Sequence, residues 1–225
     1  GKPFIELYEK QKASGGIPAS IWVTSSDNFA SWGGADKSYH NEDLAALIKA
    51  VDYVSLHTYP FQDTYYNPGF WGASAEEEGL SEAEKADAAV LRVKNYAISQ
   101  YQSTKDYIES LGLDKPIHIG ETGWASKDSD HYGAAGSQAA DEYKQRLFYQ
   151  QMRDWTNQSG ISLFFFEVFD EQWKDKGSAL GSENHFGLIN LNGEAKYALW
   201  DMVDAGTFNG LTRNGMPISK TYAGN

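Results

Sequence analysis

Four short runs of apolar residues stand out along the chain, each bounded by residues typical of turns or loops. They are ASIWVT at 19–24, YVSLH at 53–57, PIHIG at 116–120 and ISLFFFEV at 161–168. Their composition predicts strands, and none alternates cleanly between polar and apolar positions. Near-continuous apolar strands are typical of parallel sheets that are buried on both faces. We therefore expect four parallel strands at these positions.

Helical patterns lie between these runs. Residues 41–50 open with an N-cap candidate, Asn41, and an acidic first turn. Ser81 and Glu84 form a capping box, which predicts a long helix that ends near residue 110. Two further helices and two glycines at expected helix ends complete the pattern: 137–155, 195–203, Gly112 and Gly160.

Alternating strands and helices predict an α/β fold with a parallel sheet, and the length fits a single domain over residues 1–225. Each strand is followed by a polar, aromatic-rich loop, and such loops build the active site of an α/β barrel. Residues 61–79 read as one long loop, a length that is typical of functional segments. A closed barrel has eight strands and about 250 residues. Four strand–helix units cannot close alone, so either the sheet is open or half of a barrel is missing from this chain.

Composition narrows the class of ligand. The formal net charge is −12 and the sequence pI is about 4.8, so a polyanion such as nucleic acid would be repelled. Cysteine is absent, which excludes disulfides, thiolate metal sites and cysteine nucleophiles. Aromatic residues make up 14% of the chain. Their faces suit sugar-binding clefts, although aromatic residues also fill ordinary cores.

No apolar stretch of the sequence approaches the roughly 18 residues of a membrane span, so we expect no membrane-spanning helix. No signal peptide stands at Gly1, and any targeting segment would have been removed or never encoded. The lack of cysteine fits a secreted or periplasmic bacterial protein, the localisation we expect, and also fits a cytosolic one.

The segment PIHIGETGW places Glu121 directly after an apolar strand. The C-terminal end of such a strand points into the mouth of a barrel, where catalytic residues lie. Thr122, Gly123 and Trp124 then form a compact turn and an expected aromatic wall. The alternative is an ordinary exposed glutamate at a strand end.

A second segment, FFFEVFDEQWK, covers the end of the last predicted strand and the residues after it. It combines acidic side chains with aromatic ones, an arrangement that suits an oxocarbenium-like transition state. Glu167 lies inside the apolar run, where a carboxylate is costly unless it is paired. The segment also carries Asp170, Glu171, Trp173 and Lys174. The alternative is a solvated loop.

A third segment, VDYVSLHTYPF, carries His57 and Tyr59 at a strand end. Either side chain could orient a carboxylate or bond a sugar hydroxyl, although a lone histidine there is more often structural. A metal hydrolase would have to use His57, His118, Glu121 and Asp170 as ligands. His118 stands three residues before Glu121, so on a regular strand the two would point to opposite faces. We expect no metal and no cofactor.

Taken together, the segments resemble glycoside hydrolase family 17, the β-1,3-glucanases and related glucanosyltransferases. The matching blocks are VTSSD with Trp32, VDYVSLHTYPF, KPIHIGETGW, FFFEVFDEQWK and SENHFGLINLNGEAKYAL, in the order of the family. The resemblance implies a (β/α)8 barrel, a retaining mechanism and Glu121 as the nucleophile. It implies substrate-binding roles for a larger set: Tyr59, Trp124, Glu171, Trp173, Lys174, Glu183 and Phe186.

One departure from the family pattern concerns the general acid. In the family this is a glutamate in a Gly-Asn-Glu or similar motif upstream of the VTSSD block, and Asn41-Glu42 does not substitute because it opens a helix downstream. The chain is thus expected to supply strands five to eight and to lack the acid. General acid–base catalysis contributes roughly 10²–10⁴-fold, so the isolated chain should be nearly inert. A second chain or missing segment is therefore an expected partner, together with a β-glucan substrate.

Three functions stay open from the sequence. The first is a retaining β-1,3-glucan hydrolase. The second is a β-1,3-glucanosyltransferase, which uses the same two carboxyl groups. The third is a non-catalytic half barrel that binds glucan, which would leave the retention of Glu121, Glu171, Lys174 and Glu183 unexplained.

Overall fold

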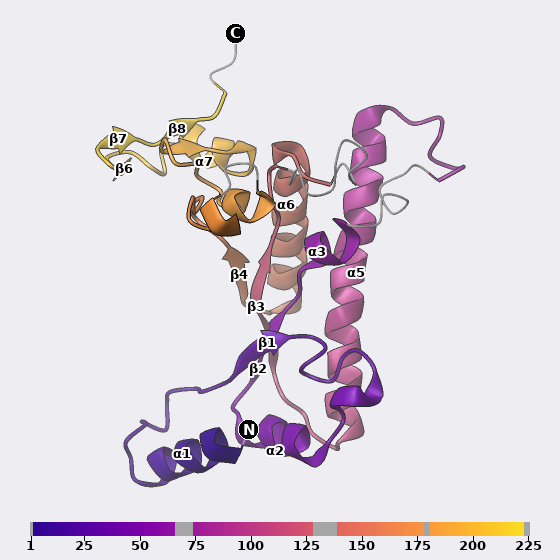
Figure 1. The fold of residues 1–225 in the computed structure, drawn as a ribbon, viewed down its shortest axis with the longest axis vertical. Helices are drawn as coiled ribbons and strands as arrows, with labels where there is room; N and C mark the ends of the chain where they lie inside the picture. The colour runs from indigo at the N-terminus through magenta and orange to yellow at the C-terminus, as the bar shows by residue number, and fades with distance from the viewer. Residues whose placement is uncertain (1, 66–73, 128–138, 178–180, 223–225) are drawn as a thin grey trace. The chain divides into compact units, whose positions relative to one another are not determined.

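The computed structural model of the chain describes residues 2–65, 74–127, 139–177 and 181–222. Its main sheet has four strands in the order β1-β2-β3-β4 (Figure 1). The pairings β1–β2 and β2–β3 are parallel, as the sequence predicts. The strands span Ser26–Asn28, Val54–His57, Ile117–Gly123 and Leu163–Phe166.

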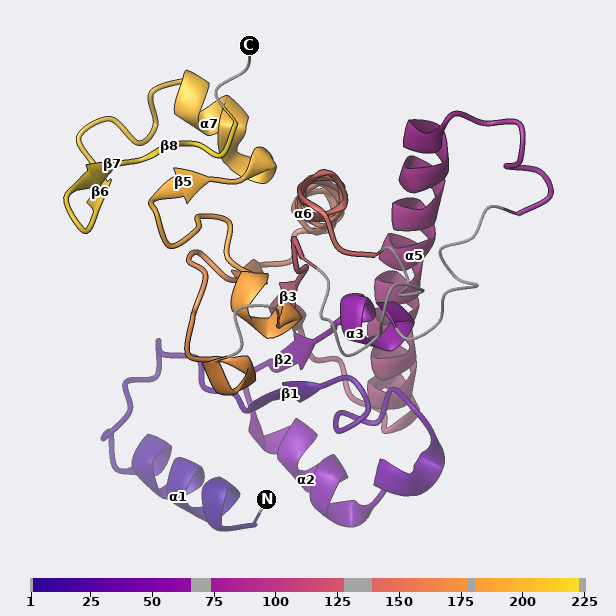
Figure 2. The ribbon, with the colours of Figure 1, turned by 45° about the horizontal axis from the view of Figure 1, so that its top comes forward.

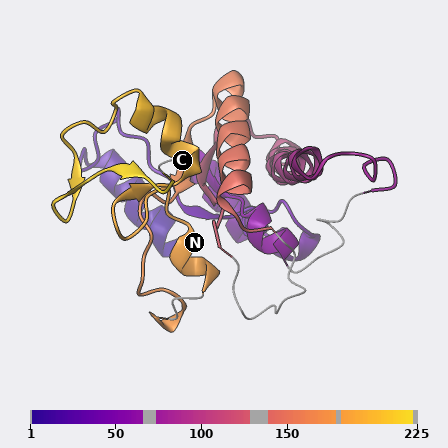
Figure 3. The same ribbon diagram turned by 90° about the horizontal axis from the view of Figure 1, so that it is seen from above.

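The α-helices are α1 Lys2–Ala13, α2 Glu42–Ala50, α3 Pro60–Tyr65, α5 Glu82–Ser110, α6 Glu142–Ser159 and α7 Trp200–Asp204. The 3₁₀ turns are η1 Lys37–Tyr39, η3 Asp175–Gly177, η4 Ser182–His185 and η5 Tyr197–Leu199. The long α5 is seen almost end-on in Figure 3. Among the described residues, no helix combines the length and apolar character needed to cross a membrane.

The contacts divide the chain into two compact units. The first comprises Gly1–Thr58, Tyr96–Thr122 and Asn157–Phe164, and the second comprises Tyr59–Asn95, Gly123–Thr156 and Phe165–Asn225.

In the first unit, the strands bury one face and leave polar groups on the other. Val54 and Leu56 of β2, and Ile117 and Ile119 of β3, are buried. His118 lies between the two isoleucines and is only partly buried. The expectation of strands buried on both faces is therefore wrong for β3, because alternate positions along it carry polar or very small residues.

The first predicted strand, 19–24, is displaced in the structure, where β1 is Ser26–Asn28. The Asp52 carboxylate accepts a hydrogen bond from the Val23 N–H at 2.8 Å, while the Asp52 N–H donates to the Val23 carbonyl at 2.9 Å. A side chain thus occupies the place of a ladder acceptor, and regular pairing begins only after this point.

The predicted helix starts are confirmed where a side chain caps them. The Asn41 side chain accepts a hydrogen bond from the Leu44 N–H at the start of α2. Ser81 and Glu84 form the reciprocal capping box of α5, with Ser81 N–H donating to Glu84 at 2.9 Å. Gly112 and Gly160 have φ of +73° and +67°, so both adopt the left-handed conformation typical of a helix end.

Two other predicted helices are corrected. Helix α6 begins at Glu142, because the Asp141 carboxylate accepts the Lys144 N–H at 2.7 Å and caps the helix there. Residues 137 and 138 of the predicted helix lie outside the described residues. The helix expected at 195–203 is a short strand, a 3₁₀ turn and α7. The Ala195 carbonyl accepts hydrogen bonds from Thr221 N–H and the Trp200 indole, so it has no helical partner.

The first part of the loop expected at 61–79 is helical in the structure, because Pro60–Tyr65 forms α3. Proline is favoured in the first turn of a helix, since its missing N–H has no partner there. Residues 66–73 of this predicted loop lie outside the described residues.

The second unit has its own hydrophobic cluster and carries the C-terminal strands. The cluster consists of Leu188, Ile189, Ala195, Ala198 and Leu199, packed against residues that include Phe165 and Tyr149. Strand β5, Glu194–Ala195, pairs in parallel with β8, Ser219–Lys220 (Figure 2). Strands β6, Thr212–Arg213, and β7, Met216–Pro217, form an antiparallel hairpin in the yellow segment of Figure 3.

Candidate active site

Glu121 and His57 face each other at the C-terminal ends of two neighbouring strands. His57 is the register partner of Glu121, after a shift in the β2–β3 pairing between Leu56 and His57. Nδ1 of His57 lies 3.5 Å from Oε2 of Glu121. The Glu121 side chain is 41% exposed, so the carboxylate is accessible to a ligand.

Two serines that sequence reasoning missed lie on the other side of the His57 ring. Ser26 Oγ is 2.5 Å from His57 Nε2 and 2.7 Å from Ser55 Oγ. Ser55 is held in turn by the Trp32 indole, whose N–H donates to its carbonyl at 3.0 Å. The sequence contained one weak indication that Ser55 lies near His57: the two residues are two positions apart in a strand and so share a face.

In the second unit, Lys174 joins two carboxylates. Its Nζ lies 2.9 Å from Glu171 Oε2 and 3.5 Å from Glu167 Oε1. Glu167 is therefore paired, as its place in an apolar run requires. Burial raises the pKa of Glu167 to about 7, although Lys174 opposes the effect. The hydrogen bond from Lys174 holds the pKa of Glu171 below its usual range.

Aromatic rings surround this lysine. Nζ of Lys174 lies 3.9 Å from the centroid of the Phe166 ring, a cation–π contact. Tyr59 contacts Phe166 and Phe186 edge to face, with centroids 6.4 and 6.3 Å away. The structure thus brings together the predicted residues Tyr59, Lys174 and Phe186 around Phe166, which was not singled out.

Three of the aromatic residues expected to bind substrate, Trp124, Phe186 and Trp173, differ in how exposed they are. Trp124 and Phe186 are 0% and 1% exposed, so neither presents an open face to a sugar ring in this structure. Trp124 donates its indole N–H to the Ala139 carbonyl at 3.0 Å and packs against Phe61. The aromatic wall expected at Trp124 is therefore part of the core. Trp173, by contrast, is 68% exposed.

Glu183 is held on both its backbone and its side chain. Its Oε1 accepts a hydrogen bond from the Gln62 amide at 3.2 Å, and its N–H donates to Asp175 Oδ2 at 3.1 Å. A carboxylate fixed in this way, in the short turn η4, is suited to accept a hydrogen bond from a ligand hydroxyl.

A buried ion pair joins Asp170 to Lys196, which sequence reasoning also missed. Lys196 Nζ donates to Asp170 Oδ1 at 2.7 Å, to Ser126 Oγ at 2.8 Å and to the His185 carbonyl at 3.2 Å. Burial lowers the pKa of Lys196, and Asp170 opposes that effect. All three ammonium hydrogens thus have acceptors, and the pair ties together the segments that follow β3 and β4.

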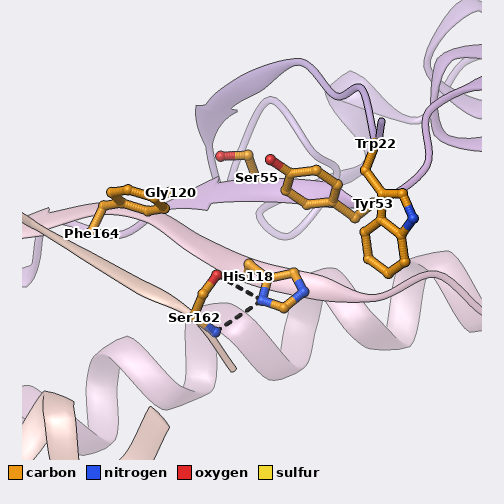
Figure 4. A pocket seen from close by; sticks show the side chains of 7 residues that line it. All are labelled: Trp22, Tyr53, Ser55, His118, Gly120, Ser162 and Phe164. Carbon is orange, nitrogen blue, oxygen red and sulfur yellow. Dashed lines mark hydrogen bonds between the residues drawn. The ribbon is translucent and has the colours of Figure 1, made fainter. Parts of the chain in front are cut away.

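The face of the main sheet that carries His118 also holds a cavity of about 340 Å³, seen in Figure 4. Trp22, Tyr53, His118, Ser162 and Phe164 are among its lining residues. His118 Nδ1 accepts a hydrogen bond from the Ser162 N–H at 2.9 Å. Over the described ranges, no three His, Asp or Glu side chains gather as a metal ion would require.

The stretch that carries the proposed nucleophile and the Lys174 cluster has recognisable relatives. Residues 101–200 match the family described as Glycosyl hydrolases family 17. A crystal structure of an endo-laminarinase from Formosa Hel1_33_131 is 56% identical, with a TM-score of 0.94 over 99% of this chain and 57% of that chain. The chain belongs to glycoside hydrolase family 17.

Two further relatives are less similar in sequence. A glucan 1,3-beta-glucosidase from Arthroderma benhamiae is 30% identical over 204 residues, which cover 85% of this chain and 54% of that protein. A family 17 beta-1,3-glucanosyltransferase from Rhizomucor miehei, 20% identical with a TM-score of 0.53 over 86% of this chain and 53% of that chain, shares the fold. The chain thus spans about half the length of these relatives. The fold of the family is the (β/α)8 barrel.

Proposed function

We propose that this chain carries the nucleophile Glu121 of a retaining β-1,3-glucan hydrolase. The observation that carries the proposal is the accessible Glu121 carboxylate at the end of a parallel strand, with His57 Nδ1 3.5 Å away. An imidazole N–H at this place can donate to one carboxylate oxygen and so hold the carboxylate in position for attack.

In this mechanism a Glu121 oxygen attacks the anomeric carbon of the glucan while the glycosidic C–O bond breaks. The leaving oxygen takes a proton from a general acid, and a covalent glycosyl-enzyme forms on Glu121. Water, deprotonated by the same acid in its conjugate form, then releases the sugar. The two carboxyl groups of a retaining enzyme lie about 5–5.5 Å apart. We propose that the acid comes from the other half of a (β/α)8 barrel, outside this sequence.

The proposed substrate is a laminarin-like β-1,3-glucan. The support is the 56% identity to a protein described as an endo-laminarinase, over nearly the whole of this chain. Transglycosylation is the alternative for the same site, because a sugar hydroxyl can replace water in the second step. The relative described as a glucanosyltransferase makes this a specific second candidate. A polymeric substrate also favours action outside the cell.

The proposed barrel would be a single catalytic domain completed by a second chain or segment. Two features of the first unit favour it. Phe164 lies in the middle of β4 and is 69% exposed, and Trp22 is exposed as well. Large apolar side chains open to water on a sheet face are an aggregation hazard unless something covers them. Native mass spectrometry of the purified material should detect a second half-barrel species, and a well-behaved lone monomer would contradict the proposed completion.

We assign the substrate contacts outside Glu121 to Tyr59, Glu171, Trp173, Lys174 and Glu183. Trp173 offers an exposed ring face, and Lys174 and Glu183 offer polar groups that are already held by neighbours. Trp124 and Phe186 are buried, so we assign them to the packing of the core and not to direct contact with the sugar. A position of Lys174 close to Glu121 stays a prediction.

The decisive experiment replaces Glu121 in the complete barrel. Glu121→Gln keeps the shape of the side chain but removes the nucleophile. The rate of laminarin hydrolysis should therefore fall about a thousandfold, which corresponds to a rise in the activation free energy on the order of 4 kcal/mol. Azide should restore turnover and yield an α-glycosyl azide, because a small anion can occupy the vacated place. The matched control is Glu109→Gln, an exposed glutamate of α5.

Retention of most activity by Glu121→Gln would show that another residue is the nucleophile. A complete barrel that binds laminarin without turnover would instead favour the non-catalytic alternative. Sugar oligomers longer than the substrate among the products would identify the transferase.

A further inference from the structure

A path of hydroxyl groups leads from the sheet to the back of the His57 ring. Ser26 and Ser55 are direct register partners across β1 and β2, and their Oγ atoms are 2.7 Å apart. Ser26 Oγ contacts His57 Nε2 at 2.5 Å, and the other nitrogen of the ring faces Glu121 at 3.5 Å. Four side chains from three neighbouring strands therefore form one polar path that ends at a carboxylate.

The direction of donation along this path follows from its end. An ionised carboxylate only accepts hydrogen bonds, so His57 Nδ1 carries the hydrogen that faces Glu121. In a neutral imidazole, Nε2 is then an acceptor, and it takes the hydroxyl hydrogen of Ser26. The Ser26 oxygen in turn accepts from the hydroxyl of Ser55.

We propose that Ser26 and Ser55 are positioning residues that hold His57 as its neutral Nδ1–H tautomer, with the donor directed at Glu121. The catalytic meaning of this arrangement rests on the proposed function, in which Glu121 is the nucleophile. A histidine in the opposite tautomer would present a lone pair to the carboxylate and repel it.

Gly120 leaves the space that the serine pair occupies. A Cβ atom at this position would lie 1.9 Å from Ser55 Oγ and 3.0 Å from Ser26 Oγ. Any other residue would displace the Ser55 hydroxyl while leaving both serines in the sequence. Gly120→Ala therefore disturbs the path without deleting a member of it.

His118 supplies an internal reference with the opposite tautomer. Its Nδ1 accepts from the backbone N–H of Ser162, and Ser162 Oγ lies 2.9 Å from the same nitrogen (Figure 4). A backbone N–H only donates, so His118 Nδ1 carries no hydrogen and the neutral ring is protonated at Nε2. The two histidines, on neighbouring strands, are thus expected to differ in tautomer.

The test is nitrogen NMR of the complete barrel with this chain labelled at histidine, at about pH 8, above the usual histidine pKa of about 6.5. His57 should show a pyrrole-type Nδ1 and a pyridine-type Nε2, and His118 the reverse. Ser26→Ala and Gly120→Ala should mix the His57 tautomers, whereas Ser26→Thr, which keeps the hydroxyl, should preserve the single form. Ser162→Ala, the matched control, should leave His57 unchanged.

A pyridine-type Nδ1 or a doubly protonated ring at His57 in the unaltered chain would overturn the proposal. So would an unchanged His57 signature in a folded Ser26→Ala variant, with His118 as the check on folding. In the complete enzyme, Ser26→Ala should lower kcat about fivefold with KM unchanged, the factor that one neutral hydrogen bond is worth. Since the spectroscopic result does not depend on catalysis, an active Glu121→Gln variant would defeat the proposed function alone.

Discussion

His57 Nδ1 lies 3.5 Å from Glu121 Oε2, across the point where the register of β2 and β3 shifts. The shift matters because it brings Glu121, rather than Gly120, opposite His57. His57 thereby becomes the neighbour of the proposed nucleophile.

His57→Ala in the complete enzyme should lower kcat on a β-1,3-glucan about tenfold and change KM little. The 3.5 Å contact of His57 with the partly exposed Glu121 carboxylate should be worth about 1.5 kcal/mol, the lower end of the range for hydrogen bonds to charged groups. Steady-state kinetics measure the effect. His118→Ala is the control, because His118 bonds Ser162 rather than Glu121. Equal losses in the two variants would mean that His57 acts only through stability.

Glu167→Gln should flatten the dependence of stability on pH. Burial raises the pKa of Glu167 from 4.5 to about 7, so between these values the folded state binds more protons than the unfolded state. The free energy of unfolding contributed by this group therefore falls as pH rises from about 4.5 to 7. The shift corresponds to at most about 3 kcal/mol, which solvent screening reduces to about 1–2 kcal/mol.

Urea unfolding of both proteins at several pH values between about 4.5 and 7 tests this expectation. The glutamine variant should lose less stability over the range than the unaltered chain. Parallel curves for the two proteins would contradict the raised pKa of Glu167.

Two tryptophans separate core packing from substrate binding. Trp124→Ala should destabilise the fold by about 3–5 kcal/mol, since it removes a fully buried ring. Trp173→Ala should leave stability nearly unchanged but raise KM for laminarin about fivefold, roughly 1 kcal/mol of lost aromatic contact. Thermal unfolding and kinetics on both variants distinguish the roles. A Trp173→Ala enzyme with unaltered KM would remove that residue from the substrate contacts.

Lys196→Met should destabilise the chain by about 3–5 kcal/mol, because it leaves Asp170 buried and without its cation. The double variant with Asp170→Asn should be less affected than the single one. Lys220→Met is the matched control: its 2.7 Å ion pair with Asp204 is exposed, so the loss should be below about 1 kcal/mol. Equal losses at the two lysines, measured by urea unfolding, would argue against a structural role of the buried pair.

The sequence by itself predicted the features that depend on neighbouring residues. The caps at Asn41 and Ser81, the left-handed glycines at 112 and 160 and the existence of the strand that carries Glu121 all follow from local periodicity and local hydrogen bonding. The strand itself runs on to Gly123, through the turn expected at Thr122 and Gly123. Their reason lies within a few residues of each position, so a single sequence is enough to read them.

Tertiary structure decided whatever depends on residues far apart in the chain. The start of β1 was set by the Asp52 side chain, 29 residues beyond Val23, and the burial of Trp124 by packing against Phe61 and Phe148. The path from Ser55 through Ser26 and His57 to Glu121 requires three strands to align, with one register shift. No local pattern encodes such an alignment, because it results from the packing of whole strands against one another.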